Sequence, residues 1–230
     1  RRLANYVEAF HKAEREPVIL YSINSFPRPG YLEEMISCYE GSFFLDRLIG
    51  FISERQVREG RLKEKKLLIL PCVTHIEDAT FEKIKEFVRN GGIVFMTENS
   101  LKYDEYGRER KERIEGERVF KVKGPLSPEK YSEELSPILE KANISRLVKV
   151  TGEKGSKVYG IEARSVKLKD GSILTYLINL SKEKQKVVLN IGFSIEKIED
   201  LILEKEVTEN FFELNPFEVR LLNIHCSTRR

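Results

Sequence analysis

Cysteine and histidine are scarce in this sequence, and that scarcity limits the kinds of site it can form. The three cysteines lie far apart in the chain: Cys38, Cys72 and Cys226. An odd, sparse set of thiols does not make a disulfide framework and favours a reducing compartment, so we predict a cytoplasmic protein. The three histidines are equally scattered: His11, His75 and His225. Their spacing predicts no metal site.

Long apolar runs, blocks of like charge and nucleotide-binding glycine motifs are also missing. No apolar run approaches the roughly 20 residues that span a bilayer, and no secretory signal is visible. The 40 basic residues nearly balance the 37 acidic ones, and the two signs are mixed along the chain. This pattern predicts neither a nucleic-acid nor a membrane partner. Because there is no Walker loop and no GxGxxG motif, we predict no cofactor.

Lysine and glutamate are abundant, whereas there are only two glutamines, which is typical of a heat-adapted protein. A length of 230 residues with 40% apolar content allows one large domain or two small ones, each with a real core. Residues 2–14 predict a helix, because Leu3, Tyr6, Val7 and Phe10 repeat at helical spacing. No capping residue precedes them and the chain opens with Arg1, so we expect a chain cut from a longer one within a helix.

The stretch from Lys66 to Glu98 predicts a strand, a helix and a second strand. Leu67 to Leu70 is an unbroken apolar run, which suits a strand covered on both faces. Ile93 to Met96 is a second run of the same kind. A strand, a helix and a strand of these lengths form a right-handed βαβ unit with a parallel sheet.

The helix of this unit is expected to begin at Asp78, which can act as a cap. Its apolar stripe has the spacing i, i+3 and i+7 and consists of Phe81, Ile84 and Val88. Asn90-Gly91-Gly92 ends the helix, because glycine adopts the left-handed C′ conformation without a Cβ clash.

Further strands and helices flank this unit and complete the first predicted domain, residues 1–143. Strands are expected at 17–22, 51–57 and 118–122, and helices at 31–49 and from Ser127 onward, with Gly41-Ser42 as a kink or break. The charged segment 99–121 is expected to be ordered only in pieces. Strands that alternate with helices predict a doubly wound α/β layer of flavodoxin type, the class that includes the class I glutamine amidotransferases.

The second predicted domain, residues 144–230, has the period-two alternation of strands. Seven strand candidates occur in about 80 residues, at 147–150, 158–168, 173–180, 186–191, 197–203, 211–214 and 219–224. Asp170-Gly171 between two alternating runs predicts a hairpin turn. This pattern is typical of a small antiparallel β-sandwich.

Cys72 follows a predicted strand end, and His75 lies three residues further on. Sites in open α/β sheets form at such ends, so a nucleophilic thiol–imidazole pair is one hypothesis. An amidotransferase-like cysteine is expected one strand later, at Met96 to Asn99, where the chain has none. A buried cysteine without a chemical role is the alternative interpretation.

Glu98 and Asn99 follow the last strand of the central unit, and Ser22, Asn24 and Ser25 follow the first strand. Parallel strand ends meet at one edge of a sheet, so these side chains could line one crevice. The candidate ligand-binding residues are therefore His75, Glu98 and Asn99. Two prolines between Ile23 and Gly30 remove amide donors that a phosphate loop needs.

Glycoside hydrolysis and carbohydrate binding would each need particular residues. A glycosidase uses two carboxylates roughly 5 to 10 Å apart, and no pair can be chosen among so many. Glu162 alternates outward on a predicted strand and is interpreted as solvated or salt-bridged. A carbohydrate-binding module favours large aromatic faces, and the sequence has no tryptophan. Exposed Tyr159, Tyr176 or Phe217 would have to replace it.

Several segments, taken in order, resemble a known family. The first set comprises Pro17 to Ser22, Leu67 to Pro71, Asp78 with Phe87 to Val94, and Asp104 to Gly107. It resembles the β-galactosidase trimerisation domain, the flavodoxin-like domain after the catalytic barrel of family 42 glycoside hydrolases. The second set comprises Arg164 to Leu180, Asp200 to Ile202 and Leu214 to Val219. It resembles the small C-terminal β domain of such enzymes.

The resemblance implies a non-catalytic region of a β-galactosidase-like glycoside hydrolase, with no catalytic residue in this chain. The implied partners are copies of the same chain and a catalytic barrel that lies elsewhere. The loops Pro27 to Tyr31 and Asn99 to Arg110 are expected to reach a neighbour. Two alternatives stay open: a stand-alone amidotransferase-like enzyme that uses Cys72 and His75, and a carbohydrate-binding module whose partner is carbohydrate.

Overall fold

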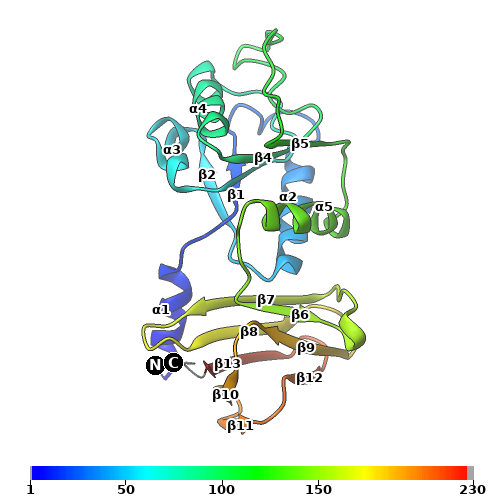
Figure 1. Ribbon diagram of the computed structural model, residues 1–230. Coiled ribbons are helices and arrows are strands. Elements are labelled where there is room, and N and C mark those ends of the chain that lie inside the picture. The colour runs from blue at the N-terminus through cyan, green and yellow to red at the C-terminus, as the bar shows by residue number, and fades with distance from the viewer. Residues whose placement is uncertain (1, 227–230) are drawn as a thin grey trace. The chain divides into compact units, whose positions relative to one another are not determined.

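The computed structural model describes residues 2–226, which form two compact units (Figure 1). One unit comprises Arg15–Ser42 and Ile49–Ser145 and is called the parallel unit here. The other comprises residues 2–14, Phe43–Leu48 and residues 146–226 and is called the β unit. The division into residues 1–143 and 144–230 stays a prediction for the domain boundary. The β unit additionally takes in two segments from the first 48 residues.

The parallel unit is built on a five-stranded sheet with the order β2-β1-β3-β4-β5. The strands are β1 (Val18–Tyr21), β2 (Gly50–Ser53), β3 (Leu67–Leu70), β4 (Ile93–Thr97) and β5 (Val119–Val122). All neighbours pair in parallel. The helices are α2 (Tyr31–Ser42), α3 (Glu54–Arg58), α4 (Asp78–Arg89) and α5 (Pro128–Lys141), with the 3-10 turn η2 at Arg61–Glu64. The predicted α/β layer with a parallel sheet is confirmed.

The predicted βαβ unit is β3, α4 and β4. Every residue of both strands is buried, and α4 buries Phe81, Ile84 and Phe87 against the sheet. A Cβ on Gly92 would lie 2.3 Å from the Phe87 ring, so the glycine lets the chain pass close to the helix before β4. Asp78 does not cap the helix by hydrogen bonding; its carboxylate accepts a hydrogen bond from Arg110.

Two predicted elements of the parallel unit end earlier than expected. The strand predicted to run to Val57 stops at Ser53, because Ser53 and Gln56 form a capping box that starts α3. The helix predicted for 31–49 ends at Ser42, where the sequence predicted a kink or break at Gly41-Ser42, and the 3-10 turn η1 (Phe43–Leu45) follows. Gly41 serves close packing: a Cβ there would lie 2.3 Å from the Pro128 carbonyl oxygen of α5.

The β unit contains eight strands in two antiparallel sheets, with the orders β11-β10-β13-β8-β7 and β12-β9-β6. The strands are β6 (Val148–Thr151), β7 (Ile161–Lys167), β8 (Ile173–Asn179), β9 (Gln185–Ile191), β10 (Ile195–Asp200), β11 (Lys205–Val207), β12 (Phe211–Leu214) and β13 (Val219–Cys226), with the turn η3 (Glu153–Gly155) after β6. Side chains from both sheets share one apolar core, which includes Leu177, Leu189 and Leu222. The predicted β-rich second part is confirmed.

One strand prediction in the β unit is wrong. The strand expected at 197–203 ends at Asp200, whose carboxylate accepts hydrogen bonds from the amides of Ile202 and Leu203, each at 3.0 Å. These bonds turn the chain, since a short acidic side chain readily replaces ladder hydrogen bonds with local ones. A separate strand, β11, follows and pairs back onto β10.

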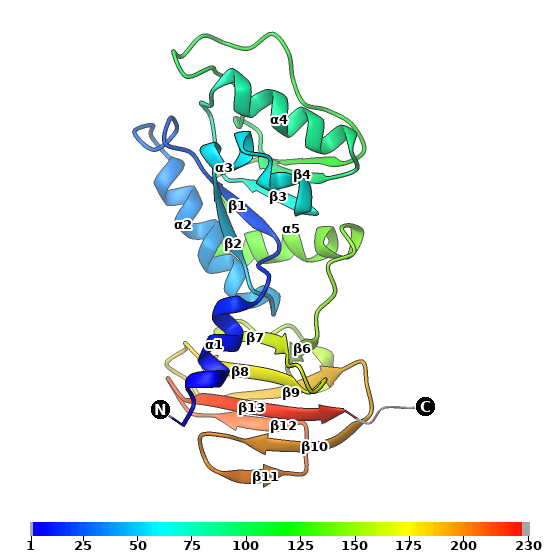
Figure 2. The ribbon, with the colours of Figure 1, turned by 90° about the vertical axis from the view of Figure 1, so that its left-hand side faces the viewer.

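The N-terminal helix α1 (Ala4–Lys12) belongs to the β unit and lies along its five-stranded sheet (Figure 2). Phe10 meets Tyr176 edge-on, with ring centroids 5.2 Å apart, and the helix joins a cluster with Val166, Leu174 and Leu221. The helix predicted at 2–14 therefore exists. Its role is to cover the outer face of a sheet formed by the other end of the chain.

Candidate functional site

The polar side chains after β1 are used to hold the neighbouring loop. Ser22 Oγ lies 2.7 Å from Glu54 Oε1 and 3.0 Å from the His75 carbonyl oxygen. Ser25 Oγ donates to the same carbonyl at 2.8 Å and accepts from the His75 amide at 3.0 Å. Ser22, Ser25 and Glu54 are all buried. The loops after β1 and β3 therefore meet through an internal hydrogen-bond network. The crevice predicted from the sequence was a different one, between the residues after β1 and those after β4.

Glu54 is the centre of this network, a role that was not predicted from the sequence. Its carboxylate accepts from Ser22 Oγ, from Asn24 Nδ2 at 3.1 and 3.2 Å, and from the Glu77 amide at 3.4 Å. The available signal was the sequence Ser53-Glu54-Arg55-Gln56, a capping box that places Glu54 in the first turn of a helix. A buried carboxylate that receives several donors is a structural tie between loops.

Cys72 and His75 do not form an activated pair. The Cys72 amide donates to Thr97 Oγ1 at 2.9 Å, and the His75 imidazole engages Thr74 through Nδ1 at 2.8 Å and stacks on Tyr103 at 4.8 Å. Within residues 2–226, no hydrogen bond joins the Cys72 thiol to His75. Burial raises the pKa of the Cys72 thiol, and the carboxylates of Glu34 and Glu33 raise it further. A nucleophilic cysteine needs the opposite shift.

This shift predicts how Cys72 reacts. With its pKa raised, Cys72 carries less thiolate at neutral pH than a small model thiol, so iodoacetamide should alkylate it several-fold more slowly. Peptide mass spectrometry after timed labelling at pH 7 measures the rate, and the urea-unfolded chain is the control in which Cys72 should react like the model thiol. Alkylation in the native chain faster than the model thiol would restore the hypothesis of a nucleophilic cysteine.

Glu98 and Asn99 line a cavity that does not include His75. Both are exposed, and the cavity, of about 330 Å³, is also lined by Lys102, Arg113 and Lys121. That the three predicted residues bind one ligand stays a prediction. Among residues 2–226, no group of three or more histidine, cysteine or acidic residues has the arrangement of a metal site.

The loop 99–110 is more ordered than the sequence predicts. Asp104 Oδ1 accepts from the amides of Tyr106 and Arg108, each at 2.9 Å, and Arg110 Nη2 donates to the Ile76 carbonyl at 2.7 Å. The two Asp104 bonds lie within the loop, and the Arg110 bond fastens the loop to the segment after β3. They leave the ring of Tyr106 76% exposed at its tip.

A group of exposed apolar side chains lies over α2 and the adjoining strands; we call it the α2 surface. It consists of Tyr21, Phe26, Leu32, Ile36 and Phe51, which are 38–48% exposed. Single exposed apolar residues are ordinary, whereas a connected group marks an interaction site.

The members of the α2 surface are connected step by step. Leu32 and Ile36 are one turn apart on α2, and Tyr39, three residues further, contacts Phe51 with ring centroids 5.3 Å apart. Phe51 pairs with Ile19 and Ser53 with Tyr21, so Phe51 and Tyr21 are diagonal neighbours on one face of the sheet. Tyr21 in turn contacts Phe26, with centroids 6.2 Å apart. Phe51 also lies on β2, the last strand of the sheet at this side.

Residues 50–153 match the family model described as the beta-galactosidase trimerisation domain, so the predicted resemblance is confirmed. No protein among the curated ones matches the chain. The fold of most of the chain recurs in solved glycoside hydrolases of the GH42 group. The chain is therefore a GH42-like region that corresponds to part of those enzymes.

Three solved structures illustrate the similarity. The apo exo-carrageenase GH42 from Bacteroides ovatus has a TM-score of 0.79 at 17% identity, with 98% of this chain and 31% of that chain covered. A catalytic mutant of Gan42B, a GH42 beta-galactosidase from G. stearothermophilus, has a TM-score of 0.70 at 18% identity, covering 92% and 40%. The beta-galactosidase from Bacillus circulans sp. alkalophilus has a TM-score of 0.68 at 12% identity, with 97% of this chain and 43% of that chain covered. This chain thus spans less than half the length of each.

Proposed function

We propose that this chain is a non-catalytic assembly region of a β-galactosidase-like glycoside hydrolase and that it joins copies of itself through the α2 surface. The observation that carries the proposal is a connected apolar surface on α2 and the edge strand β2 of the parallel unit. The match to a trimerisation family begins at Gly50, so it includes β2 with Phe51, while α2 packs beside the matched segment. An exposed sheet edge with apolar side chains is a liability for a monomer and is normally covered. Association with a second copy covers it.

The symmetry of the assembly follows from the number of copies. A three-membered ring needs a head-to-tail interface, in which the α2 surface of one copy contacts a different surface of the next. The loops Pro27 to Tyr31 and Asn99 to Arg110 are the proposed counterparts, and Tyr106 supplies an exposed ring at the tip of the second loop. A ring of this kind closes on itself, so it does not grow into a filament.

The experiment that tests assembly is the solution mass of the purified 230-residue chain. Light scattering coupled to size exclusion should give about three times 26.8 kDa at micromolar concentration, because a stable interface of standard size gives such affinities. A second experiment tests the non-catalytic role: the purified chain should hydrolyse no nitrophenyl galactoside. A mass of one chain at all concentrations would contradict assembly. Hydrolysis that is lost on replacing a carboxylate of this chain would contradict the non-catalytic role.

Several finer features belong to the same proposal. The strand order β2-β1-β3-β4-β5 supports a flavodoxin-type sheet, whose order along the chain is 2-1-3-4-5. The second partner we propose is a catalytic barrel on another segment or subunit, since the chain covers at most 43% of the structures described above. The proposed compartment is the cytoplasm, on the evidence of free cysteines alone. Within residues 2–226, no helix has the length and apolar character needed to cross a bilayer.

A further inference from the structure

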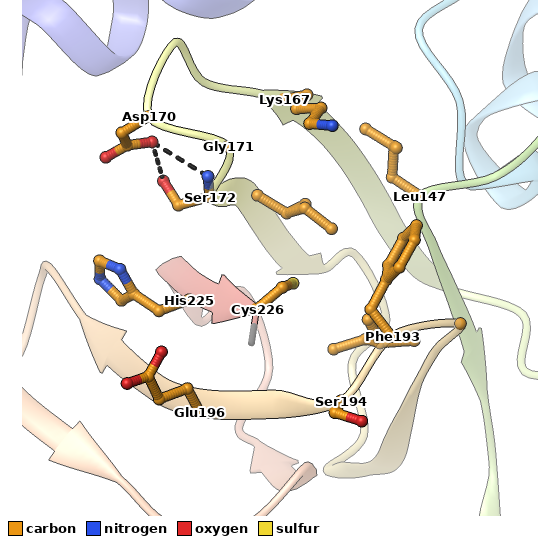
Figure 3. Close-up of a pocket in the computed structure, with 13 residues that line it drawn as sticks. Leu147, Lys167, Asp170, Gly171, Ser172, Phe193, Ser194, Glu196, His225 and Cys226 are labelled. Atoms are coloured by element: carbon orange, nitrogen blue, oxygen red, sulfur yellow. Dashed lines mark hydrogen bonds between the residues drawn. The ribbon is translucent and has the colours of Figure 1, made fainter. Parts of the chain in front are cut away.

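The β unit contains a cavity of about 900 Å³ at one end of its sandwich (Figure 3). Two turns and one strand end form it: the β7–β8 turn with Asp170, the β9–β10 turn with Phe193, and the end of β13 with His225 and Cys226. Pockets that hold small ligands have volumes of roughly 300 to 1,000 Å³, so this cavity is large enough for one. All its lining residues belong to the β unit.

The walls of the cavity differ in chemistry. Asp170, Glu196 and His225 lie on one side in Figure 3, and Leu147 and Phe193 lie on the other. Phe193 is 57% exposed although it is a large apolar side chain in a turn. An exposed aromatic ring opposite two carboxylates forms a cavity with one face for C–H groups and one face for hydroxyl groups.

Two side chains of the polar wall, Asp170 and His225, are held in place by neighbouring residues. Asp170 Oδ1 accepts from Ser172 Oγ at 2.7 Å and from the Ser172 amide at 3.0 Å, which fixes the carboxylate and lowers its pKa. His225 Nε2 lies 3.2 Å from Glu199 Oε2 and 3.1 Å from Asn223 Nδ2. Because Asp170 is already fixed, it loses little conformational entropy when it accepts a hydrogen bond from a ligand.

The charge of the lining narrows the ligand class. Two carboxylates repel an anion, and a purely apolar ligand would leave both of them desolvated without partners. Lys167, which also lines the cavity, carries a positive charge that repels a simple cation. A neutral carbohydrate fits both walls, because its C–H face stacks on an aromatic ring while its hydroxyls donate to carboxylates.

We propose that this cavity binds a neutral sugar, with Phe193 as the stacking platform and Asp170 and Glu196 as hydroxyl acceptors. The site differs from the aromatic platforms expected from the sequence. Tyr176 packs on Phe10, and Tyr159 meets Phe44 edge-on at 5.8 Å. The proposal does not depend on assembly of the chain.

Nuclear magnetic resonance of the ¹⁵N-labelled 230-residue chain tests this site, with D-galactose, D-glucose and lactose as separate probes. At least one sugar should shift the amides of Gly171, Gly192 and Phe193 saturably, with a dissociation constant of about 1 mM, as a small solvent-exposed site gives. Phe193→Ala should weaken binding about tenfold, which corresponds to the loss of one stacked ring. Phe217→Ala is the matched control, an exposed phenylalanine of the β unit outside the cavity, and should not change affinity.

Glu196→Gln provides a second variant that keeps the shape of the side chain. It should weaken sugar binding while leaving the spectrum of the unliganded chain intact elsewhere. The proposal is overturned if none of the three sugars gives saturable shifts at the cavity, if the shifts map to another surface, or if inorganic sulfate shifts the same amides while neutral sugars do not. The measurement is independent of oligomer mass, so its failure is distinguishable from failure of the assembly proposal.

Discussion

Replacing Ile36 with glutamate is expected to convert the assembled chain into monomers. Ile36 is 45% exposed and lies in the α2 surface, and glutamate is a good helix former on α2. In an assembly the new carboxylate would be buried without a partner, which costs several kcal/mol. We expect the dissociation constant of the interface to rise by at least about 100-fold.

The chain offers a matched control for this variant. Ile202 is also an exposed isoleucine, 38% accessible, but it lies on the turn after β10 in the β unit. Ile202→Glu should leave the solution mass unchanged at every concentration at which the unsubstituted chain is assembled. If Ile36→Glu keeps the full mass, or if Ile202→Glu dissociates the assembly equally, the α2 surface is not the interface.

The second large effect concerns Asp46, which anchors the segment Phe43–Leu48 in the β unit. Its carboxylate is 6% exposed, accepts from the Val150 amide at 3.2 Å and lies 3.9 Å from Arg146 Nη1. Burial raises its pKa from 3.8 to about 7, and the Val150 amide and Arg146 offset only part of this. Its protonated form is therefore favoured by folding.

This shift makes stability depend on pH between the two pKa values. Below about pH 4 the group is protonated in the folded and unfolded chains alike, and its contribution is fully favourable. As pH rises toward 7 the unfolded chain releases the proton and the folded chain keeps it, so stability falls. Asp46→Asn cannot ionise, so relative to the unsubstituted chain it should gain up to about 3 kcal/mol in unfolding free energy between pH 4 and pH 7.

Urea titrations of both chains at several pH values measure this difference. Asparagine tolerates the positive φ of 53° at position 46, and its side-chain oxygen can still accept from Val150, so the variant should fold. Asp78→Asn is the control: Asp78 is 68% exposed, and a solvent-exposed ion pair adds little to stability at any pH. A constant difference between Asp46→Asn and the parent chain from pH 4 to pH 7 would refute the buried-acid account.

Much of the fold could be predicted because local patterns coincide with the tertiary structure. The runs Leu67–Leu70 and Ile93–Thr97 are strands because they are buried on both faces, and the helix between them shows its buried face in its spacing. Period-two alternation likewise identified most strands of the β unit. Two strands end at short polar signals, the capping box at Ser53 and the hydrogen bonds that Asp200 accepts. The spacing of apolar residues does not reveal such signals, so these strand ends were predicted wrongly.

Other features depend on contacts between distant residues and could not be predicted. The packing of Phe10 on Tyr176 joins positions more than 160 residues apart, and periodicity shows only that residues 4–12 have an apolar face. The same holds for Glu54, whose partners come from two loops, and for the cavity at Phe193, which two turns and a strand end create together. Which residues line the cavity at Glu98 and Asn99 also depends on loop paths that sequence spacing does not determine.

Hydrogen–deuterium exchange at two protein concentrations can locate the surface that assembly covers, and so tests whether copies of the chain join through the α2 surface. The account predicts that peptides from Tyr31–Ser42 and Gly50–Ser53 exchange more slowly in the concentrated, assembled sample than in the dilute sample. The peptide from Asp78–Arg89 should exchange equally in both and serves as the internal control. Equal exchange of the α2 peptide in both samples, while the solution mass shows assembly, would contradict the account.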